Sequence, residues 1–241
     1  MKRVIFLLLV LAFICQGCDM AKYRVFKSYI TRYYNAGNIG IDTTFWGNIR
    51  IYGVRGEESS GEHYSWYSEG KEKEKYEELC QIHNDVSYNK KREYHHTPEW
   101  GACSAIDFIS IDVVSDSDFD DTHSKGVSLK DIVRFVSISP KKFIDSKYSD
   151  TFDWETDKPE IFKQDSIINR IYHIYEKQNY FPINKLLSEV GVDEMQLLPL
   201  TDYGFLVFDK EPTLEKEHTL TITIKTRNGK TYVKTIKKTF K

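Results

Sequence analysis

An acidic loop at residues 116–123, with the sequence DSDFDDTH, carries the densest group of side chains that could do chemistry. Asp116, Asp118 and Asp120 place carboxylates at alternate positions, and such oxygens can converge on a hard cation such as Ca²⁺. An EF-hand would need glycine in place of Asp121 and glutamate in place of Val127, so that motif is excluded. We favour a solvated loop whose aspartates cap backbone amides, with Ca²⁺ as the alternative and no other cofactor.

Tyr64 and Trp66, in the segment 63–68 (HYSWYS), are candidates for a glycan-stacking platform. In an extended strand the two rings share one face, and flat aromatic rings with polar tips can stack on sugars. The same residue types also fill protein cores, because they bury a large apolar area. We favour the core position and keep glycan stacking as the alternative.

Motifs for catalysis and nucleotide binding are absent from the sequence. It contains no G-x-S-x-G, no P-loop and no G-x-G-x-x-G. An aspartate close to a histidine, such as Asp121 with His123, occurs by chance in many sequences and does not by itself indicate a catalytic site. The sequence therefore predicts a protein without catalytic activity, and a hydrolase of the cell envelope is the least favoured alternative.

The composition bounds the class of protein. The chain has 241 residues, of which 40% are hydrophobic and 29% charged, with a formal net charge of −2. It is long enough to bury a sizeable core, and its composition excludes a disordered chain, a collagen and a polytopic membrane protein. The negative net charge also argues against a nucleic-acid partner, since non-specific binding needs a cationic face.

The N-terminus has the pattern of an export signal. Lys2 and Arg3 precede an apolar run at residues 4–14, which is too short to span about 30 Å of hydrocarbon as a helix. A basic region followed by a short apolar run is typical of a signal peptide. Gly17 then stands directly before Cys18.

This ending resembles the lipobox of bacterial lipoproteins. The resemblance implies that residues 1–17 are removed and that the Cys18 thiol carries a diacylglycerol. Cys15 stands where the strict pattern has leucine, and Gln16 departs from it too. Such relaxed boxes resemble those of gut-dwelling Gram-negative anaerobes. The expected location is the cell envelope, anchored by lipid to the outer membrane on either face; an ordinary secretory signal is the alternative.

Export would leave Cys80 and Cys103 in an oxidising compartment, where a disulfide can persist. A bridge between them would stabilise the fold by about 3 kcal/mol in the chain-entropy model. The alternative is two buried thiols that never meet, because a cysteine count does not establish proximity.

Hydrophobic periodicity predicts one β-rich domain over residues 45–241, preceded by a lipid-anchored segment at 18–44. Strands are expected at 45–54, 105–114 and 203–208. Helices are expected at 71–84, 164–178 and 185–190, the last two forming a helical insert near 164–191. In the strand at 105–114, alternation predicts that Ile109, Ile111 and Val113 share one face. Residues 128–131 resemble a capping box that opens a short helix.

Two alternating runs at the C-terminus predict a hairpin. A three-residue loop, Arg227 to Gly229, pairs Ile224 with Tyr232 and puts the apolar residues of both strands on one face. A two-residue loop would pair Ile224 with Val233 instead, and Tyr232 would face the other way. We therefore expect the longer loop, with Gly229 in the left-handed conformation.

Strands at both ends with helices between them predict a mainly β fold: a β-sandwich with helical insertions. The closing hairpin resembles that of immunoglobulin-like domains in secreted lipoproteins. Residues 103–132 (CSAIDFISIDVVSDSDFDDTHSKGVSLKDI) resemble a lipoprotein family of unknown function from the same gut anaerobes. The resemblance implies an envelope location and a sandwich fold, and it brings no activity. The expected role is interaction or structure, with the membrane and an unidentified protein or glycan as partners.

Overall fold

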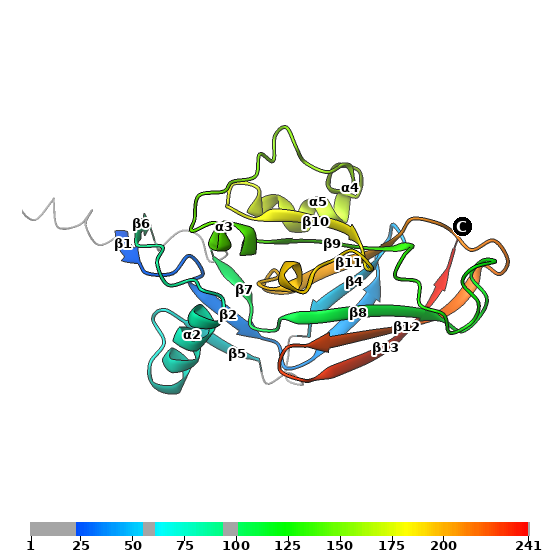
Figure 1. The fold of residues 1–241 in the computed structure, drawn as a ribbon, viewed down its shortest axis with the longest axis horizontal. Helices are drawn as coiled ribbons and strands as arrows, with labels where there is room; N and C mark the ends of the chain where they lie inside the picture. The colour runs from blue at the N-terminus through cyan, green and yellow to red at the C-terminus, as the bar shows by residue number, and fades with distance from the viewer. Residues whose placement is uncertain (1–22, 55–60, 94–100, 241) are drawn as a thin grey trace, which may run out of the picture.

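Strands, which pair mainly antiparallel, are the commonest regular element among the described residues (Figure 1). The computed structural model describes residues 23–54, 61–93 and 101–240, so Cys18 and the signal peptide predicted at residues 1–17 lie outside the described part. The largest sheet has five strands in the order β10 (Phe181–Leu186), β9 (Val133–Ser139), β11 (Asp202–Phe208), β4 (Ile49–Gly53) and β3 (Ile39–Thr43). Because β3 pairs with β4, the β-rich body begins before residue 45.

The remaining strands of the described residues form three smaller sheets. The first contains β13 (Thr231–Thr239), β12 (Glu217–Thr226) and β8 (Phe108–Ser115). The second contains β5 (Glu62–Ser65), β2 (Arg32–Asn35) and β7 (Ala102–Ser104), with β2 and β7 parallel. The third pairs β1 (Tyr23–Phe26) with β6 (Lys90–Glu93). The fold is therefore mainly β, as the sequence predicts.

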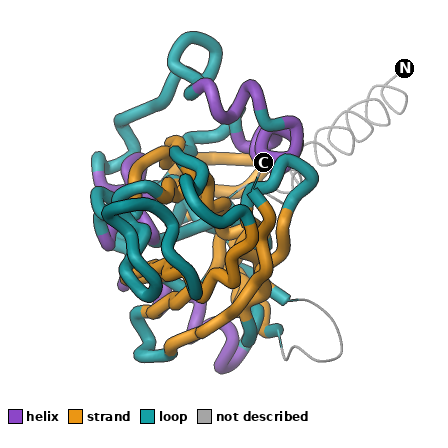
Figure 2. The backbone as a smooth tube through the Cα atoms, turned by 90° about the vertical axis from the view of Figure 1, so that its right-hand side faces the viewer, coloured by secondary structure: helices purple, strands orange, loops and turns teal. Residues whose placement is uncertain are grey.

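Helical segments are short except for α2 (Gly70–Ile82). The others are α3 (Lys141–Asp145), α4 (Glu160–Gln164), α5 (Ser166–Tyr172) and the single 3-10 turns η1 (His173–Tyr175) and η2 (Val192–Met195). Figure 2 shows helical segments above and below the stacked strands. Within the described residues, no helix combines the length and apolarity that crossing a bilayer requires.

The five-stranded sheet is buried on both faces by different partners. One face contributes Ile49, Phe135 and Leu206 to a core shared with Val113, Leu220, Ile222 and Ile224 of the β8–β12–β13 sheet. On the other face, Val136 and Phe205 pack with Ile168 and Tyr172 of α5. Phe135 and Val136 are adjacent in β9 and point to opposite faces, as pleating requires. Figure 1 shows the two coverings above and below the sheet.

The C-terminal hairpin confirms the predicted register. Ile224 pairs with Tyr232 and Leu220 with Ile236, and Gly229 has φ of +83°. The inner face of β12 carries the fully buried Leu220, Ile222 and Ile224, and its threonines alternate with them. The three-residue loop is therefore set by the side on which the apolar residues must lie.

Strand β8 differs from the prediction at its first residues. Ile111 and Val113 are buried, but Ile109 is 37% exposed and Phe108 is buried in its place. The pairing of β12 with β8 shifts between Lys225, which faces Ser110, and Thr226, which faces Phe108. Ile109 is thus the extra residue of a bulge, and a bulge reverses the faces on either side of it.

Three of the predicted helical segments need correction. Residues 185–190 are not a helix: β10 ends at Leu186, and Pro182 lies in this edge strand, where its missing N–H costs no ladder bond. The helix expected at 164–178 is interrupted, because the Asp165 side chain caps Ile167 and Ile168 and starts α5 there. The segment 128–131 is not helical: Ser128 forms an isolated β-bridge with Val114, its hydroxyl donates to Asp112, and residues 130–132 form a turn.

A buried carboxylate connects the N-terminal segment to the body. Asp85 follows α2 and is 0% exposed; its oxygens accept hydrogen bonds from the amides of Tyr29 and Ile30, both at 2.7 Å, and from the Tyr148 hydroxyl at 2.9 Å. Burial raises the pKa of Asp85 to about 6 despite these donors. This one side chain therefore fixes the chain between β1 and β2.

Shortening a side chain in the shared core tests its contribution to stability. We expect Ile222→Ala to lower the free energy of unfolding by about 3 kcal/mol, because it leaves a cavity between the two sheets. The matched control is Thr221→Ala on the outer face of the same strand, with an expected loss below about 1 kcal/mol. Urea denaturation measures both, and equal losses would contradict the assigned faces.

Candidate functional site

The acidic loop connects β8 to β9, and its three predicted ligand residues bind backbone amides of different segments. Asp116 accepts from the Thr219 amide at 2.7 Å, and Asp118 accepts from the Lys125 amide at 2.8 Å. Asp120 accepts from the amides of Thr122 and His123 at 2.8 and 2.9 Å. The Thr219 amide also lowers the pKa of Asp116. This is the capping arrangement that we favoured from the sequence.

The expected Ca²⁺ alternative gains no support from this geometry. The carboxylates of Asp116, Asp118 and Asp120 face separate partners, and Ca²⁺ needs about six to eight converging oxygens. Across residues 23–54, 61–93 and 101–240, no group of three or more histidine, cysteine, aspartate or glutamate side chains is arranged to hold a metal ion. The loop is therefore described best as a folded loop held by its own aspartates.

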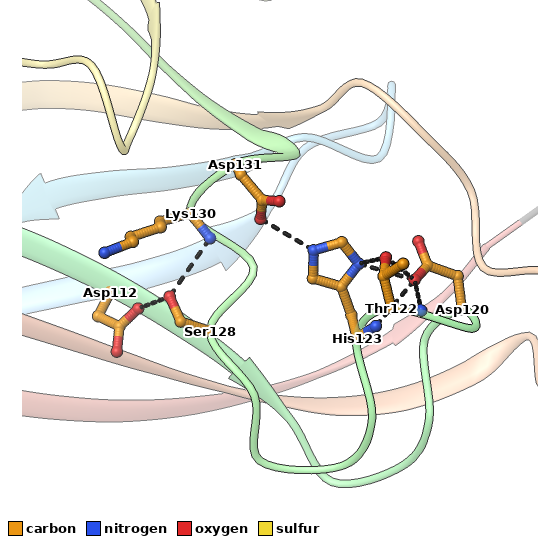
Figure 3. A network of polar contacts seen from close by, with 7 residues as sticks. All are labelled: Asp112, Asp120, Thr122, His123, Ser128, Lys130 and Asp131. Atoms are coloured by element: carbon orange, nitrogen blue, oxygen red, sulfur yellow. Dashed lines mark hydrogen bonds and ion pairs between the residues drawn. The ribbon is translucent and has the colours of Figure 1, made fainter.

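A buried histidine bridges two carboxylates within this loop (Figure 3). His123 Nδ1 lies 2.7 Å from Asp120 Oδ1, and His123 Nε2 lies 2.9 Å from Asp131 Oδ1. A neutral imidazole carries a single N–H, so only the protonated ring donates to both carboxylates. The spacing Asp120-x-x-His123 is visible in the sequence, but the contribution of Asp131 depends on how the loop folds back.

The contacts shift the pKa of all three groups. Burial alone would lower the pKa of His123, but the hydrogen bonds from the ring to Asp120 and Asp131 outweigh it, and the pKa is raised. Burial alone would raise the pKa of Asp120, but the hydrogen bonds from Thr122 and His123 bring it below its usual value. For Asp131, the hydrogen bond from His123 is the main cause of a lowered pKa.

A second buried histidine, His218, joins β8 to β12. The hydroxyls of Ser115 and Ser117 lie 2.7 and 3.1 Å from His218 Nδ1, and Nε2 lies 2.9 Å from the Glu215 carbonyl oxygen. Because a carbonyl only accepts, Nε2 carries the proton and Nδ1 accepts from the hydroxyls. His218 and Ser115 are each 3% exposed, so this serine–histidine contact is enclosed and has a structural role.

A third histidine lies near a shallow cleft with a volume of about 260 Å³. His83 Nε2 is 3.5 Å from Asp107 Oδ2, and Arg227 Nε is 3.3 Å from the same oxygen. Burial lowers the pKa of His83, and burial also raises the pKa of Asp107. Among the described residues, neither ring nitrogen of His83 has a partner in hydrogen-bonding geometry.

The two predicted sugar-stacking residues do not form a platform. Tyr64 is only 9% exposed, whereas Trp66 follows the end of β5, is partly buried and packs edge-on against Phe26 at 5.3 Å. Because the strand ends at Ser65, the alternation that would align the two rings does not continue to Trp66. The core position, which we favoured from the sequence, describes Tyr64.

The considered disulfide is not formed: Cys80 and Cys103 are two free, buried thiols. Cys80 lies on α2, and Cys103 lies on β7, where its sulfur is 3.4 Å from the Tyr180 hydroxyl. Burial raises the pKa of Cys80 to about 11 and also raises that of Cys103. Both residues belong to one hydrophobic cluster, but they lie on different elements.

Comparisons with known proteins leave the function to be argued from this chain alone. No family model, no curated protein and no solved structure matches it. The sequence, the fold and the chemistry of the described side chains are therefore the grounds for any functional conclusion.

The His123 contacts predict a pH-dependent contribution to stability. Because the pKa of His123 is raised in the folded protein, its contacts stabilise the fold fully at pH values below 6.5, the pKa of the unfolded state. This stabilisation is lost as the pH rises through the pKa of the folded state. Asp120 and Asp131, whose pKa values are lowered, keep their contribution to the stability of the fold at pH values above 3.8, the pKa of the unfolded state. We expect His123→Gln to lower the free energy of unfolding by about 1–2 kcal/mol near pH 5.5 and by clearly less near pH 9.

Urea denaturation of wild type and variant at the two pH values measures this difference. Comparing the two proteins at each pH cancels the titration of other groups, Asp85 included. The exposed His173→Gln variant controls for replacing an imidazole by an amide. A loss that is the same at both pH values would contradict the charged bridge.

The amide-capping role of the aspartates predicts how the protein responds to calcium. We expect the same melting temperature in Ca²⁺ and in EDTA, because Asp116, Asp118 and Asp120 already accept hydrogen bonds from backbone amides. Differential scanning calorimetry measures it. A rise of several degrees in Ca²⁺ that Asp118→Asn removes would instead establish a cation site.

Proposed function

We propose that the protein is an exported, lipid-anchored cell-envelope protein with a non-catalytic role in interaction or structure. The observation that carries the proposal is the N-terminal sequence: Lys2 and Arg3, the apolar run 4–14, then Gly17 before Cys18. Acyl chains on Cys18 would hold the protein on a bilayer, since each buried methylene contributes about 0.8 kcal/mol.

The arrangement of the body is compatible with this role. The first described strand, β1, begins at Tyr23, so few residues separate it from Cys18. We further propose that the two sheets with a shared core form a β-sandwich of immunoglobulin-like type, as the resemblance to lipoprotein domains implies. Such a scaffold presents loops to a partner.

A non-catalytic role agrees with how the polar side chains are used. The aspartates of the loop 116–123 hold backbone amides, and His123 and His218 are enclosed by carboxylates, hydroxyls and a carbonyl. Groups occupied in this way support the fold and leave the surface of the loops for recognition. An outer-membrane location, on either face, completes the proposal.

Labelling with a fatty-acid analogue tests the anchor. We expect the wild-type protein to incorporate the label and Cys18→Ala to lose it completely, because the thiol of Cys18 is the acceptor. Cys15→Ala is the matched control and should keep the label, since cleavage before Cys18 removes residue 15. Mass spectrometry of the native N-terminus gives an independent readout. Label retained in Cys18→Ala would refute the anchor.

A further inference from the structure

The strands β1 and β6 form a separate two-stranded ribbon that is rich in cations. We define the basic ribbon as residues 23–27 and 90–93, which pair antiparallel with Arg24 facing Arg92. It lies at one end of the long axis of the molecule, away from the C-terminus (Figure 1). Its cations are Arg24, Lys27, Lys90, Lys91 and Arg92, beside a single acid, Glu93. The chain as a whole is net negative, so this end differs in charge from the remainder.

Two arginines attach the ribbon to the body. The Arg92 guanidinium lies 5.3 Å from the ring centre of Tyr29 and donates to the Tyr29 carbonyl oxygen at 3.0 Å. The Arg24 guanidinium lies 4.6 Å from the ring centre of Trp66. Cation–π contacts of this kind hold a charge at a defined place on the surface. The ribbon is thus a fixed cationic surface, with Lys27, Lys90 and Lys91 exposed on it.

A cleft of about 550 Å³ opens between the ribbon and α2. Arg24, Lys27 and Lys73 line it together with Trp66, and its lining contains a single acid, Glu77, which lies 3.7 Å from Lys73. Beside the cleft, Val25 is 59% exposed. Cations next to an amphipathic indole and an exposed aliphatic side chain are the combination found where proteins meet the headgroup layer.

The length of chain before β1 places the ribbon near the lipid. Five residue steps separate Cys18 from Tyr23, and a fully extended chain spans at most about 3.6 Å per residue. The start of β1 therefore lies within about 18 Å of the Cys18 backbone, whatever path the chain takes. A surface tethered this closely meets membrane headgroups at a high effective concentration.

We propose that the basic ribbon and the adjoining cleft bind the headgroups of anionic phospholipids in the membrane that holds the anchor. This inference rests on the proposed lipid anchor and goes beyond it, because an anchor alone leaves the orientation of the domain free. Each cation close to an anionic surface increases the affinity about fivefold. Docking of the ribbon would give the domain one orientation, with the β8–β9 loop and the C-terminus at the opposite end.

Lysine acylation on vesicles tests the proposal. The lipidated full-length protein is reconstituted in vesicles of phosphatidylcholine, with or without phosphatidylglycerol, and amine modification is followed by mass spectrometry. We expect modification of Lys27, Lys90 and Lys91 to slow about tenfold in the anionic vesicles, the factor that one to two cations supply. Lys237 of β13 serves as an internal reference. About 1 M NaCl should abolish the difference by screening.

Charge variants give the matched comparison. In Lys27→Gln with Lys90→Gln, the slowing of Lys91 modification should fall to about twofold or less. The control Lys225→Gln with Lys230→Gln removes the same charge elsewhere on the surface, keeps the reference Lys237 and should leave the slowing unchanged. Equal modification of the ribbon lysines in both vesicle types would overturn the proposal and leave the ribbon to an acidic protein or glycan.

Flotation separates failure of the ribbon from failure of the anchor. Protein that floats with pure phosphatidylcholine vesicles carries its lipid, and the acylation comparison then tests the ribbon alone. If the protein does not float with them, the anchor proposal fails. Flotation with vesicles that contain phosphatidylglycerol then tests the ribbon without the anchor. Binding that is reversed by salt supports the ribbon proposal, and the absence of binding overturns it.

Discussion

One buried carboxylate joins the N-terminal segment to the rest of the fold, in addition to the pairing of its strands. Asp85 receives two backbone amides from residues 29 and 30 and a hydroxyl from Tyr148, so it joins three segments that are distant in sequence. Without it, those donors would be buried without partners, which costs more than the hydrogen bonds contribute. The basic ribbon precedes this junction and the β2 strand follows it, so the geometry of the end proposed to face the membrane depends on a side chain that never reaches the surface.

The second constraint is the five-stranded sheet, which must be covered on both faces. The β8–β12–β13 sheet covers one face and the helical segments 160–175 cover the other. This requirement explains why the short helices persist despite their length, since helices of a few residues are unstable alone and depend on packing. The connecting loops take part in these cores as well, since Phe119 of the β8–β9 loop is fully buried in the core that the two sheets share.

Sequence reasoning succeeded where one face of an element had to be buried. The alternation of Leu220, Ile222 and Ile224 determined the hairpin register and the conformation of Gly229, because any other pairing would have exposed Tyr232. It failed at residues 185–190, where a short apolar run fits a helix and a strand equally and only pairing with β9 decides. The bulge at Ile109 was also invisible, since it depends on the partner strand.

In the candidate site, local spacing was informative and long-range contact was not. The aspartates at 116, 118 and 120 were placed in a capping role from residue type alone, and each accepts from backbone amides. The pairing of His123 with Asp131, and of His218 with Ser115, requires the loop and β12 to fold against β8. No periodicity in the chain encodes those distances.

The two enclosed thiols have a practical consequence if the protein is exported as proposed. Thiolates, and not thiols, attack disulfides, and a raised pKa keeps Cys80 and Cys103 protonated at neutral pH. The folded chain should therefore withstand air and oxidising buffers without a reducing agent. For these two sulfurs, oxidation is expected mainly before folding, when both are still accessible to solvent.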